Sequence, residues 1–189
     1  MKKIAIFASG SGSNAQNIIE YFAQKPVAQV ELILTNRSDA YVLNRAESFN
    51  IPAYIFTRDE LYNSTLILQL LAKHNIDLIV LAGFLWLVPD NLLKTYPNRI
   101  VNIHPALLPQ YGGKGMYGAR VHEAVIANQE KFSGITIHYI NERYDEGDAI
   151  FQAKCEVMPN DTPDSLAERV HALEYEHFPR VIDEILASY

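Results

Sequence analysis

The first half of the chain alternates between apolar runs and segments of helical periodicity. Runs rich in branched and aromatic residues, bounded by polar or glycine-containing turns, predict strands at residues 3–8, 30–35, 53–56 and 76–82. Segments whose apolar residues recur every three or four positions predict helices at residues 14–24, 41–49 and 60–74. This order of elements indicates a right-handed, doubly wound parallel sheet.

The pattern changes after residue 101. Two strand-like segments, 132–140 and 149–157, are joined by a short polar link that contains glycine, and they predict an antiparallel pair. A segment at 162–188 predicts a last helix, with a break near Pro179. No repeat and no linker divides the sequence. We therefore expect one α/β domain over residues 1–189, with a Rossmann-like, mostly parallel sheet, an antiparallel carboxyl-terminal part and helices on both faces.

Composition narrows the class of protein. Of the 189 residues, 49% are hydrophobic, which excludes general disorder, and the formal net charge of -6 disfavours a protein built to bind nucleic acid. The single cysteine, Cys155, cannot form an internal disulfide, as is usual in a reducing compartment. No apolar run reaches the roughly 18 residues of a membrane span. We expect a cytoplasmic protein that binds small molecules rather than a membrane or a nucleic acid.

A glycine-rich turn follows the first predicted strand. Residues 9–15 read Ser-Gly-Ser-Gly-Ser-Asn-Ala and precede the first predicted helix. Free amides at a helix start, assisted by the positive end of the helix dipole, bind phosphate, so Gly12, Ser13 and Asn14 are candidate phosphate-binding residues. The alternative is a plain turn in which Ser13 or Asn14 only caps the helix.

The same turn matches the permissive dinucleotide fingerprint Gly-x-Gly-x-x-Ala. That fingerprint requires an acidic residue near the end of the second strand, where this chain has Asn36 and Arg37, with Asp39 slightly late. Because Arg37 could bind a 2′-phosphate, an NADP-dependent oxidoreductase or a plain nucleotide-binding module stays open as an alternative.

A second candidate site lies at the end of the apolar stretch 100–104. Successive side chains of a strand alternate between its faces, so Asn102 and His104 project from the same side. Pro105 ends the strand, and the carboxyl ends of strands are where α/β sheets place ligands. An amide donor beside a histidine can stabilise an oxyanion and move a proton.

Several segments taken together resemble a known family. These are the turn at 10–14, Leu-Ala-Gly-Phe-Leu at 81–85, Asn-Ile-His-Pro-Ala-Leu-Leu-Pro at 102–109, Gly-Ile-Thr-Ile-His at 134–138, Asp-Glu-Gly at 145–147 and Ala-Ile-Phe-Gln at 149–152. In order and spacing, over nearly the whole chain, they resemble the glycinamide ribonucleotide formyltransferases. The Asn-x-His-Pro segment and the later aspartate are typical of the wider formyltetrahydrofolate-using superfamily, and the Gly-Ser-Asn turn marks this family within it.

The resemblance implies a reaction of purine biosynthesis. A formyl group passes from the co-substrate 10-formyltetrahydrofolate to the glycinamide amine of the ribonucleotide, without a metal. Amine attack on the formyl carbon creates a tetrahedral species with a negative oxygen, to which the Asn102 amide can donate. His104 supplies or accepts the proton, and Asp145, if close, raises the histidine pKa. Asn102, His104 and Asp145 are therefore the expected catalytic residues.

The resemblance also implies the binding residues. The amino half would hold the ribonucleotide, and the carboxyl half would bind folate and carry the catalytic residues. The ribonucleotide residues would be Gly12, Ser13, Asn14, His171 and Glu174, with Glu174 on the ribose hydroxyls. The formyl-folate residues would be Leu85, Trp86, Leu87, Val88, Asn102 and Asp145. His138 would lie near the catalytic group or pack in the core.

Two features depart from the family pattern. Trp86 stands where better-known members have arginine, which leaves the folate glutamate tail without that charge and makes Arg58 a candidate partner. Residues 111–118 contain four glycines where many relatives have a shorter loop, and they predict a mobile lid over the site rather than an unstructured connection. Lys114 in this loop could contact phosphate or the folate tail.

Other formyl-folate enzymes remain alternatives. A formyltetrahydrofolate hydrolase would use the same Asn, His and Asp, with water in place of the amine, but such relatives usually carry a further amino-terminal domain. A methionyl-tRNA formyltransferase would normally carry a further carboxyl-terminal domain, and the acidic composition also disfavours tRNA. We expect a monomer or a homodimer.

Overall fold

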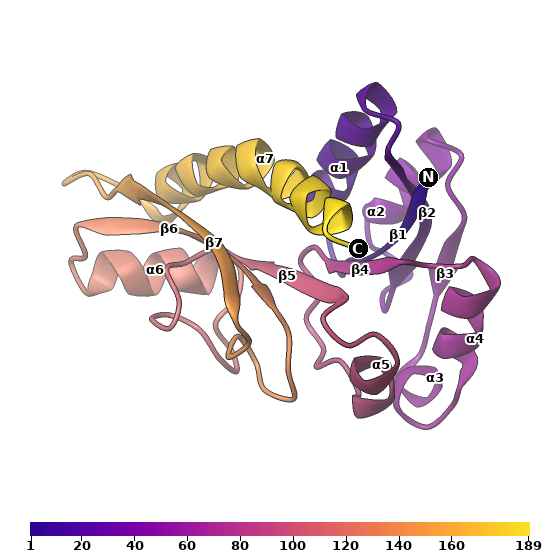
Figure 1. Ribbon diagram of the computed structural model, residues 1–189. Coiled ribbons are helices and arrows are strands. Elements are labelled where there is room, and N and C mark those ends of the chain that lie inside the picture. Colours follow the sequence, from indigo (N-terminus) through magenta and orange to yellow (C-terminus); the bar gives the residue numbers. More distant parts are fainter.

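A seven-stranded mixed sheet forms the centre of the molecule (Figure 1). The computed structural model describes all 189 residues. The strands are β1 (Lys2–Phe7), β2 (Ala28–Thr35), β3 (Ala53–Ile55), β4 (Leu78–Leu81), β5 (Ile100–His104), β6 (Phe132–Tyr139) and β7 (Ala149–Glu156). Their order is β3-β2-β1-β4-β5-β6-β7, with β6 and β7 antiparallel to their neighbours and all other pairs parallel. The predicted fold class is confirmed.

Helices cover both faces of the sheet. They are α1 (Ser13–Gln24), α2 (Val42–Ser48), α3 (Arg58–Tyr62), α4 (Leu66–Lys73), α5 (Asp90–Thr95), α6 (Ala119–Ala127) and α7 (Pro163–Ala187). Alternate residues of β1 enter two different cores, as the period of a strand requires. Ile4 and Ile6 pack in the core under α1, α2 and α7, whereas Ala5 and Phe7 pack in the core under α3, α4 and α5.

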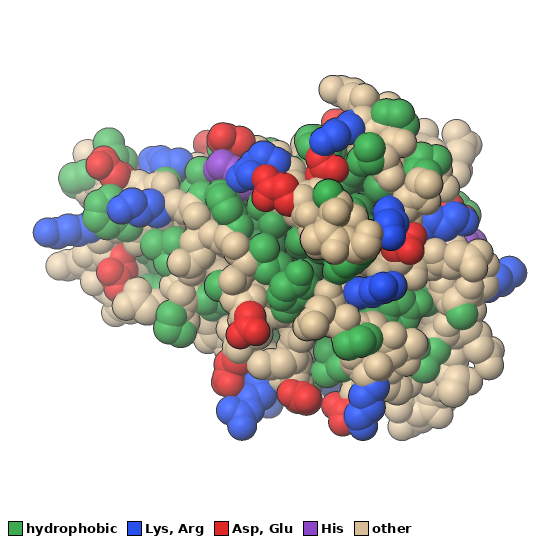
Figure 2. Space-filling view, viewed as in Figure 1, with side chains coloured by type: hydrophobic (Ala, Val, Ile, Leu, Met, Phe, Trp, Pro, Cys, Tyr) green, Lys and Arg blue, Asp and Glu red, His purple; other side chains and the backbone are tan.

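Charged side chains do not segregate by sign on the visible face of the molecule. Figure 2 shows acidic and basic side chains intermixed around its rim, with apolar side chains gathered towards the middle. None of the helices is both long enough and apolar enough to span a membrane.

The single helix predicted at 60–74 is wrong, because the structure has two helices there. Thr57 and Glu60 form a capping box that starts α3. The Ser64 hydroxyl then donates to the Glu60 carbonyl at 2.7 Å and accepts from the Leu66 amide at 3.2 Å, so it replaces helical bonds at the junction. Such local side-chain bonds compete with the helix and account for the break.

The break predicted near Pro179 is also absent, because α7 runs through it without interruption. A proline removes the bond that its own nitrogen would donate to the carbonyl four residues earlier, here that of Tyr175. The Asn17 side chain of α1 donates to that carbonyl at 2.8 Å. A neighbouring helix therefore supplies the bond that Pro179 cannot, and this compensation could not be read from local sequence.

Gly134 lets β6 and β7 approach one another. A Cβ atom at this position would lie 2.0 Å from the Ala153 carbonyl oxygen and 2.9 Å from a Leu107 methyl group. Both obstacles are held in place, one by the sheet ladder and the other by the packed loop after β5. Glycine is therefore required here for space.

We predict that Gly134→Ala lowers the free energy of unfolding by about 2 kcal/mol, since overpacking of a fixed site costs about 1–3 kcal/mol. Denaturant titration measures the change. The control is Ser133→Ala on the same strand, which removes a buried hydroxyl without a partner and leaves stability unchanged or slightly higher. A Gly134→Ala change below about 0.5 kcal/mol would contradict the close-approach argument.

Candidate active site

A cavity of about 700 Å³ opens at the carboxyl ends of β1, β4 and β5. β1 and β4 lie side by side at the centre of the sheet, where the strand order reverses and where open α/β sheets bind ligands. The wall of the cavity is formed by the turn after β1, the turn after β4, the end of β5, the loop before α6, and α7. We call this space the central cavity.

One residue of the glycine-rich turn, Gly12, has a backbone conformation and close neighbours that only glycine accommodates well. Gly12 has φ of 70° and precedes α1, and a Cβ atom there would lie 2.4 Å from a Val42 methyl group. Arg45 fastens the turn from outside by donating to the Ser11 carbonyl at 2.7 Å. Ser13 and Asn14, at the open start of the helix, line the central cavity. Gly12 thus shapes the turn, while its two successors face the cavity.

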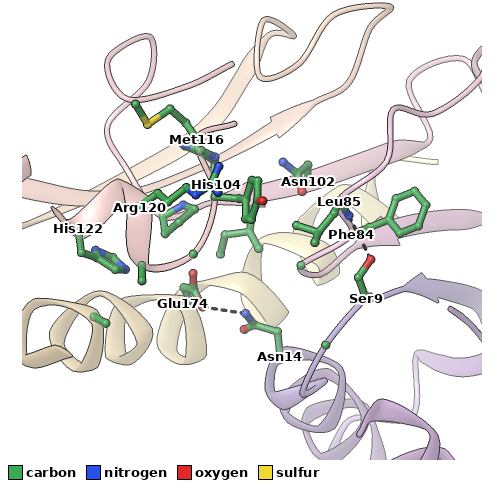
Figure 3. Close-up of a pocket in the computed structure, with 18 of the residues that line it drawn as sticks. Ser9, Asn14, Phe84, Leu85, Asn102, His104, Met116, Arg120, His122 and Glu174 are labelled. Atoms are coloured by element: carbon green, nitrogen blue, oxygen red, sulfur yellow. Dashed lines mark hydrogen bonds between the residues drawn. The ribbon is translucent and has the colours of Figure 1, made fainter. Parts of the chain in front are cut away.

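Asn14 and Glu174 meet although 160 positions separate them in sequence. The Asn14 amide donates to the Glu174 carboxylate at 2.8 Å (Figure 3). Glu174 is only 6% exposed, and burial raises its pKa despite the Asn14 bond and the nearby His171. His171 lines the cavity one helical turn before Glu174. The predicted ribonucleotide residues therefore lie together at one end of the cavity.

Asn102, His104 and Asp145 come together at the other end. His104, 4% exposed at the end of β5, donates from Nε2 to the Tyr111 carbonyl at 2.7 Å, because a carbonyl can only accept. Its other ring nitrogen, Nδ1, lies 3.5 Å from Asp145 Oδ2. That oxygen also accepts from the Gly113 amide at 2.9 Å. The spatial grouping expected from the sequence is present.

His138 contacts two of these three residues directly, Asn102 and Asp145. In the antiparallel pairing of β5 with β6 it lies opposite Asn102, and its Nε2 is 3.1 Å from the Asn102 amide nitrogen. The ring's Nδ1 donates to the Tyr139 carbonyl at 2.8 Å, so in the neutral ring Nε2 accepts from Asn102. The same Nε2 lies 3.7 Å from Asp145 Oδ1. His138 therefore orients the Asn102 amide.

Thr136 holds the loop that follows His104. It lies opposite His104 in the ladder, and its hydroxyl donates to the Ala106 carbonyl at 2.7 Å while accepting from the Leu108 amide at 3.0 Å. Gln152 on β7 donates to the same hydroxyl at 2.9 Å. The 134–138 and 149–152 motifs thus support the segment that follows His104.

Asp145 raises the pKa of His104, but it does not decide the direction of the net shift. Burial lowers the pKa of His104 below its ordinary value, and the opposing effects of Asp145 and of the bond to Tyr111 do not overcome it. For Asp145, burial by itself raises the pKa, but the nearby His138 and His104 and the bond from the Gly113 amide hold it below its usual range. The two shifts together favour a neutral imidazole beside a carboxylate.

The expected folate residues divide into two groups. Leu85 lines the central cavity together with Asn102 and Asp145, whereas Trp86, Leu87, Val88 and Arg58 are not part of its wall. Trp86 packs among aromatic rings that include Phe56, with the Arg58 guanidinium 5.2 Å from its ring centre. Leu87 offers its carbonyl to the Tyr62 hydroxyl at 2.8 Å. A cation therefore lies against the ring of Trp86.

The predicted lid forms one wall of the cavity. Its first part is fixed, because Tyr111 and Gly113 bond His104 and Asp145 through their backbones, and the Tyr111 hydroxyl donates to Glu130 at 2.7 Å. Residues 113–120, Lys114 among them, line the cavity. The loop thus lines the site, and its role as a mobile lid stays a prediction.

Three residues of the cavity wall were not among the predicted site residues. The Ser9 hydroxyl donates to Asn36 at 2.7 Å and accepts from the Leu85 amide at 3.2 Å, which joins the turns after β1, β2 and β4. Arg120 and His122 from α6 line the cavity. Ser9 lay inside the quoted glycine-rich turn, but α6 itself was not predicted, so nothing pointed to the other two.

Comparison with known proteins decides the family. The sequence profile described as "Formyl transferase" matches residues 2–182. The chain belongs to the formyl transferase family. The resemblance inferred from the motifs is confirmed, and this membership leaves no support for the NADP-dependent oxidoreductase.

Relatives within the family carry consistent names. Phosphoribosylglycinamide formyltransferase of Bacillus subtilis is 37% identical, with 98% of this chain and 95% of that protein covered. The chloroplastic enzyme of that name from Arabidopsis thaliana is 42% identical over 97% of this chain, which spans only 65% of that relative's length. The crystal structure of phosphoribosylglycinamide formyltransferase from Streptococcus pneumoniae superposes with a TM-score of 0.86 at 38% identity, covering 98% and 99% of the two chains.

The structure contains no group of three or more His, Cys, Asp or Glu residues arranged to hold a metal ion. Arg37 lines the cavity, but Asp39 binds its guanidinium through two hydrogen bonds of 3.0 and 2.8 Å. The guanidinium is therefore already paired in the ligand-free protein.

Burial of His122 has a consequence for stability at acid pH. Burial, with His171 and His104 nearby, lowers the pKa of His122 to about 4. Below pH 6.5 the His122 ring binds a proton in the unfolded chain but not in the folded chain. The free energy of unfolding therefore falls as the pH drops from 6.5 to about 4. We predict that His122→Leu removes on the order of 3 kcal/mol of this loss, measured by denaturant titration across that window. Parallel stability curves for the two proteins would contradict it.

Proposed function

We propose that this chain transfers the formyl group of 10-formyltetrahydrofolate to the glycinamide amine of N1-(5-phospho-D-ribosyl)glycinamide in purine biosynthesis. The observation that carries the proposal is that a phosphate-type helix start and the Asn102–His104–Asp145 group open onto one cavity. Relatives named for this reaction, at 37% and 42% identity, support it. In this reading one domain provides both binding sites, with most ribonucleotide contacts in its amino half.

The Asn102 amide is suited to the developing oxyanion. Its Nδ2 carries two hydrogens, and one is directed to His138. The second remains for the oxygen of the tetrahedral species. Because His138 and the β5–β6 ladder fix the amide beforehand, little reorganisation is needed when charge develops.

His104 is suited to carry the proton. Its Nε2 hydrogen is engaged by Tyr111, so a proton gained during the reaction goes to Nδ1, which faces Asp145. The amine attacks the formyl carbon, Nδ1 takes a proton from the positive nitrogen, and Asp145 stabilises the imidazolium. The C–N bond to the folate then breaks, and the same proton passes to the leaving nitrogen. The proton that the attacking amine loses is the one that the leaving folate nitrogen gains, so amide formation and folate release need no further reactant.

Ribonucleotide binding follows from the other end of the cavity. The helix start at Gly12, Ser13 and Asn14 suits the phosphate, with His171 close by. Glu174 gives one oxygen to Asn14 and keeps acceptor capacity for ribose hydroxyls.

The formyl-folate would enter beside Leu85, between this group and the catalytic residues. We propose backbone contacts from the segment 85–88, and Arg58, held against Trp86, as the partner of the folate's glutamate tail. The loop 111–118 would close over the bound substrates and exclude water. No metal takes part in these steps. We also propose, as part of the same function, that the protein is cytoplasmic.

The decisive test is folate turnover, followed by absorbance, with and without the ribonucleotide. We predict turnover that depends on the ribonucleotide. Equal turnover without it would instead favour a formyltetrahydrofolate hydrolase, and no turnover under either condition would remove the proposal.

Substitutions at the catalytic group separate its roles. Asn102→Ala should lower kcat by about 100- to 1,000-fold, the usual effect of losing one oxyanion donor. His104→Ala and Asp145→Asn should each lower kcat at least about 100-fold while ribonucleotide binding, measured by calorimetry, persists. Near-normal kcat in either variant would refute the assigned role.

Substitutions at the turn should act on binding instead. Ser13→Ala and Asn14→Ala should each raise the Kd for the ribonucleotide about tenfold, the effect of losing one hydrogen bond of about 1.4 kcal/mol. Asn17→Ala, on the same helix but bonded to α7, is the matched control and should leave this Kd unchanged. Unchanged affinity in all three variants would return the turn to a purely structural role.

A further inference from the structure

Only three side-chain polar atoms in the structure are buried without a hydrogen-bond partner. They are Asn14 Oδ1, His122 Nδ1 and Ser133 Oγ. Leaving a buried polar group unpaired costs about 1–3 kcal/mol, so each case requires an explanation. Asn14 and His122 both line the central cavity, whereas Ser133 does not. A ligand in the cavity would explain the first two.

His122 is built into the cavity wall by α6. The residue is 2% exposed and follows the buried Val121 in the first turn of α6. This helix packs against α7. No protein group bonds its ring, and the groups that influence it are His171 of α7 and His104 of β5. Figure 3 shows His122 on the side of His104 away from Asn102, with Glu174 lying between His122 and Asn14. The ring thus lies on the wall of the cavity that α6 forms, near His171, which is one helical turn before Glu174.

The chemistry of the ring indicates what it would bind. No carboxylate pairs with it, and burial favours its uncharged form at neutral pH. An uncharged imidazole donates from one nitrogen and accepts at the other. A sugar hydroxyl, which also donates and accepts, matches it better than a phosphate, whose recognition favours a cation. Asn14 Oδ1 is likewise an acceptor without a donor, and it lies on the residue that bonds Glu174.

We propose that His122 is a further ribonucleotide-binding residue, whose imidazole hydrogen-bonds a ribose hydroxyl at the end of the cavity where Asn14 and Glu174 lie. This inference rests on the proposed function and deepens it. It assigns to α6 a part in recognising the sugar, beside the residues of α1 and α7.

The test compares binding of the ribonucleotide and of its 2-deoxyribose and 3-deoxyribose analogues by calorimetry. His122→Leu should raise the Kd of the ribonucleotide about tenfold, while the analogue that lacks the contacted hydroxyl binds wild type and variant equally. His122→Gln, which keeps a donor and an acceptor, should recover part of the affinity. The KM for 10-formyltetrahydrofolate should stay unchanged in both variants.

Ser133→Ala is the matched control, since it removes the third unpaired atom, outside the cavity, and should leave the ribonucleotide Kd unchanged. Equal ribonucleotide affinity in wild type and His122→Leu overturns the inference and leaves His122 as a packing residue. If His122→Leu does not fold, His122→Gln becomes the test. A His122→Gln protein that loses all of the ribonucleotide affinity or keeps all of it, and that does not distinguish the two analogues, then overturns the inference as well. Wild-type protein that neither binds the ribonucleotide nor transfers formyl overturns the proposed function and this inference together, whereas an active wild type with an unaffected variant overturns this inference alone.

Discussion

Antiparallel pairing of β6 with β5 is the constraint on which the site depends. It sets His138 opposite Asn102 and Thr136 opposite His104, so one strand carries the groups for chemistry and the other the groups that hold them. A one-residue slip of β6 would turn Thr136 and His138 to the other face of the sheet, away from His104 and Asn102. The space provided by Gly134 keeps β7 close enough for Gln152 to bond Thr136. The catalytic geometry is thus a property of the ladder.

Burial then decides the charge of each group within that frame. The carboxyl of Asp145 stays ionised because two histidines and a backbone amide compensate for its burial. His104 has only one carboxylate nearby, and burial prevails, which favours the neutral ring. Glu174 has an amide as its main partner, and its pKa is raised. The cavity therefore has an ionised carboxylate, Asp145, beside a neutral histidine at one end. At the other end it has the hydrogen-bonded carboxyl group of Glu174, whose pKa is raised.

Much of this was predictable from local sequence. The strand periods gave the sheet, and the spacing of Asn102 and His104 put both on one side of β5. What local sequence could not give was the outcome of tertiary competition. Pro179 looked like a helix break until Asn17, from another helix, bonded the free carbonyl. The sign of the His104 pKa shift depended on how deeply a histidine beside a carboxylate is buried, and the orphan nitrogen of His122 exists only because α6 packs where it does.

The proposed proton transfer starts from a His104 ring that is a neutral imidazole, with its hydrogen on Nε2 and its free Nδ1 facing Asp145. Nitrogen-15 chemical shifts of the His104 ring, followed by NMR as a function of pH, measure this protonation state. We expect the Nε2–H tautomer at neutral pH and a pKa lowered from the ordinary value of 6.5. A hydrogen on Nδ1, or a ring that is already an imidazolium at neutral pH, would contradict it.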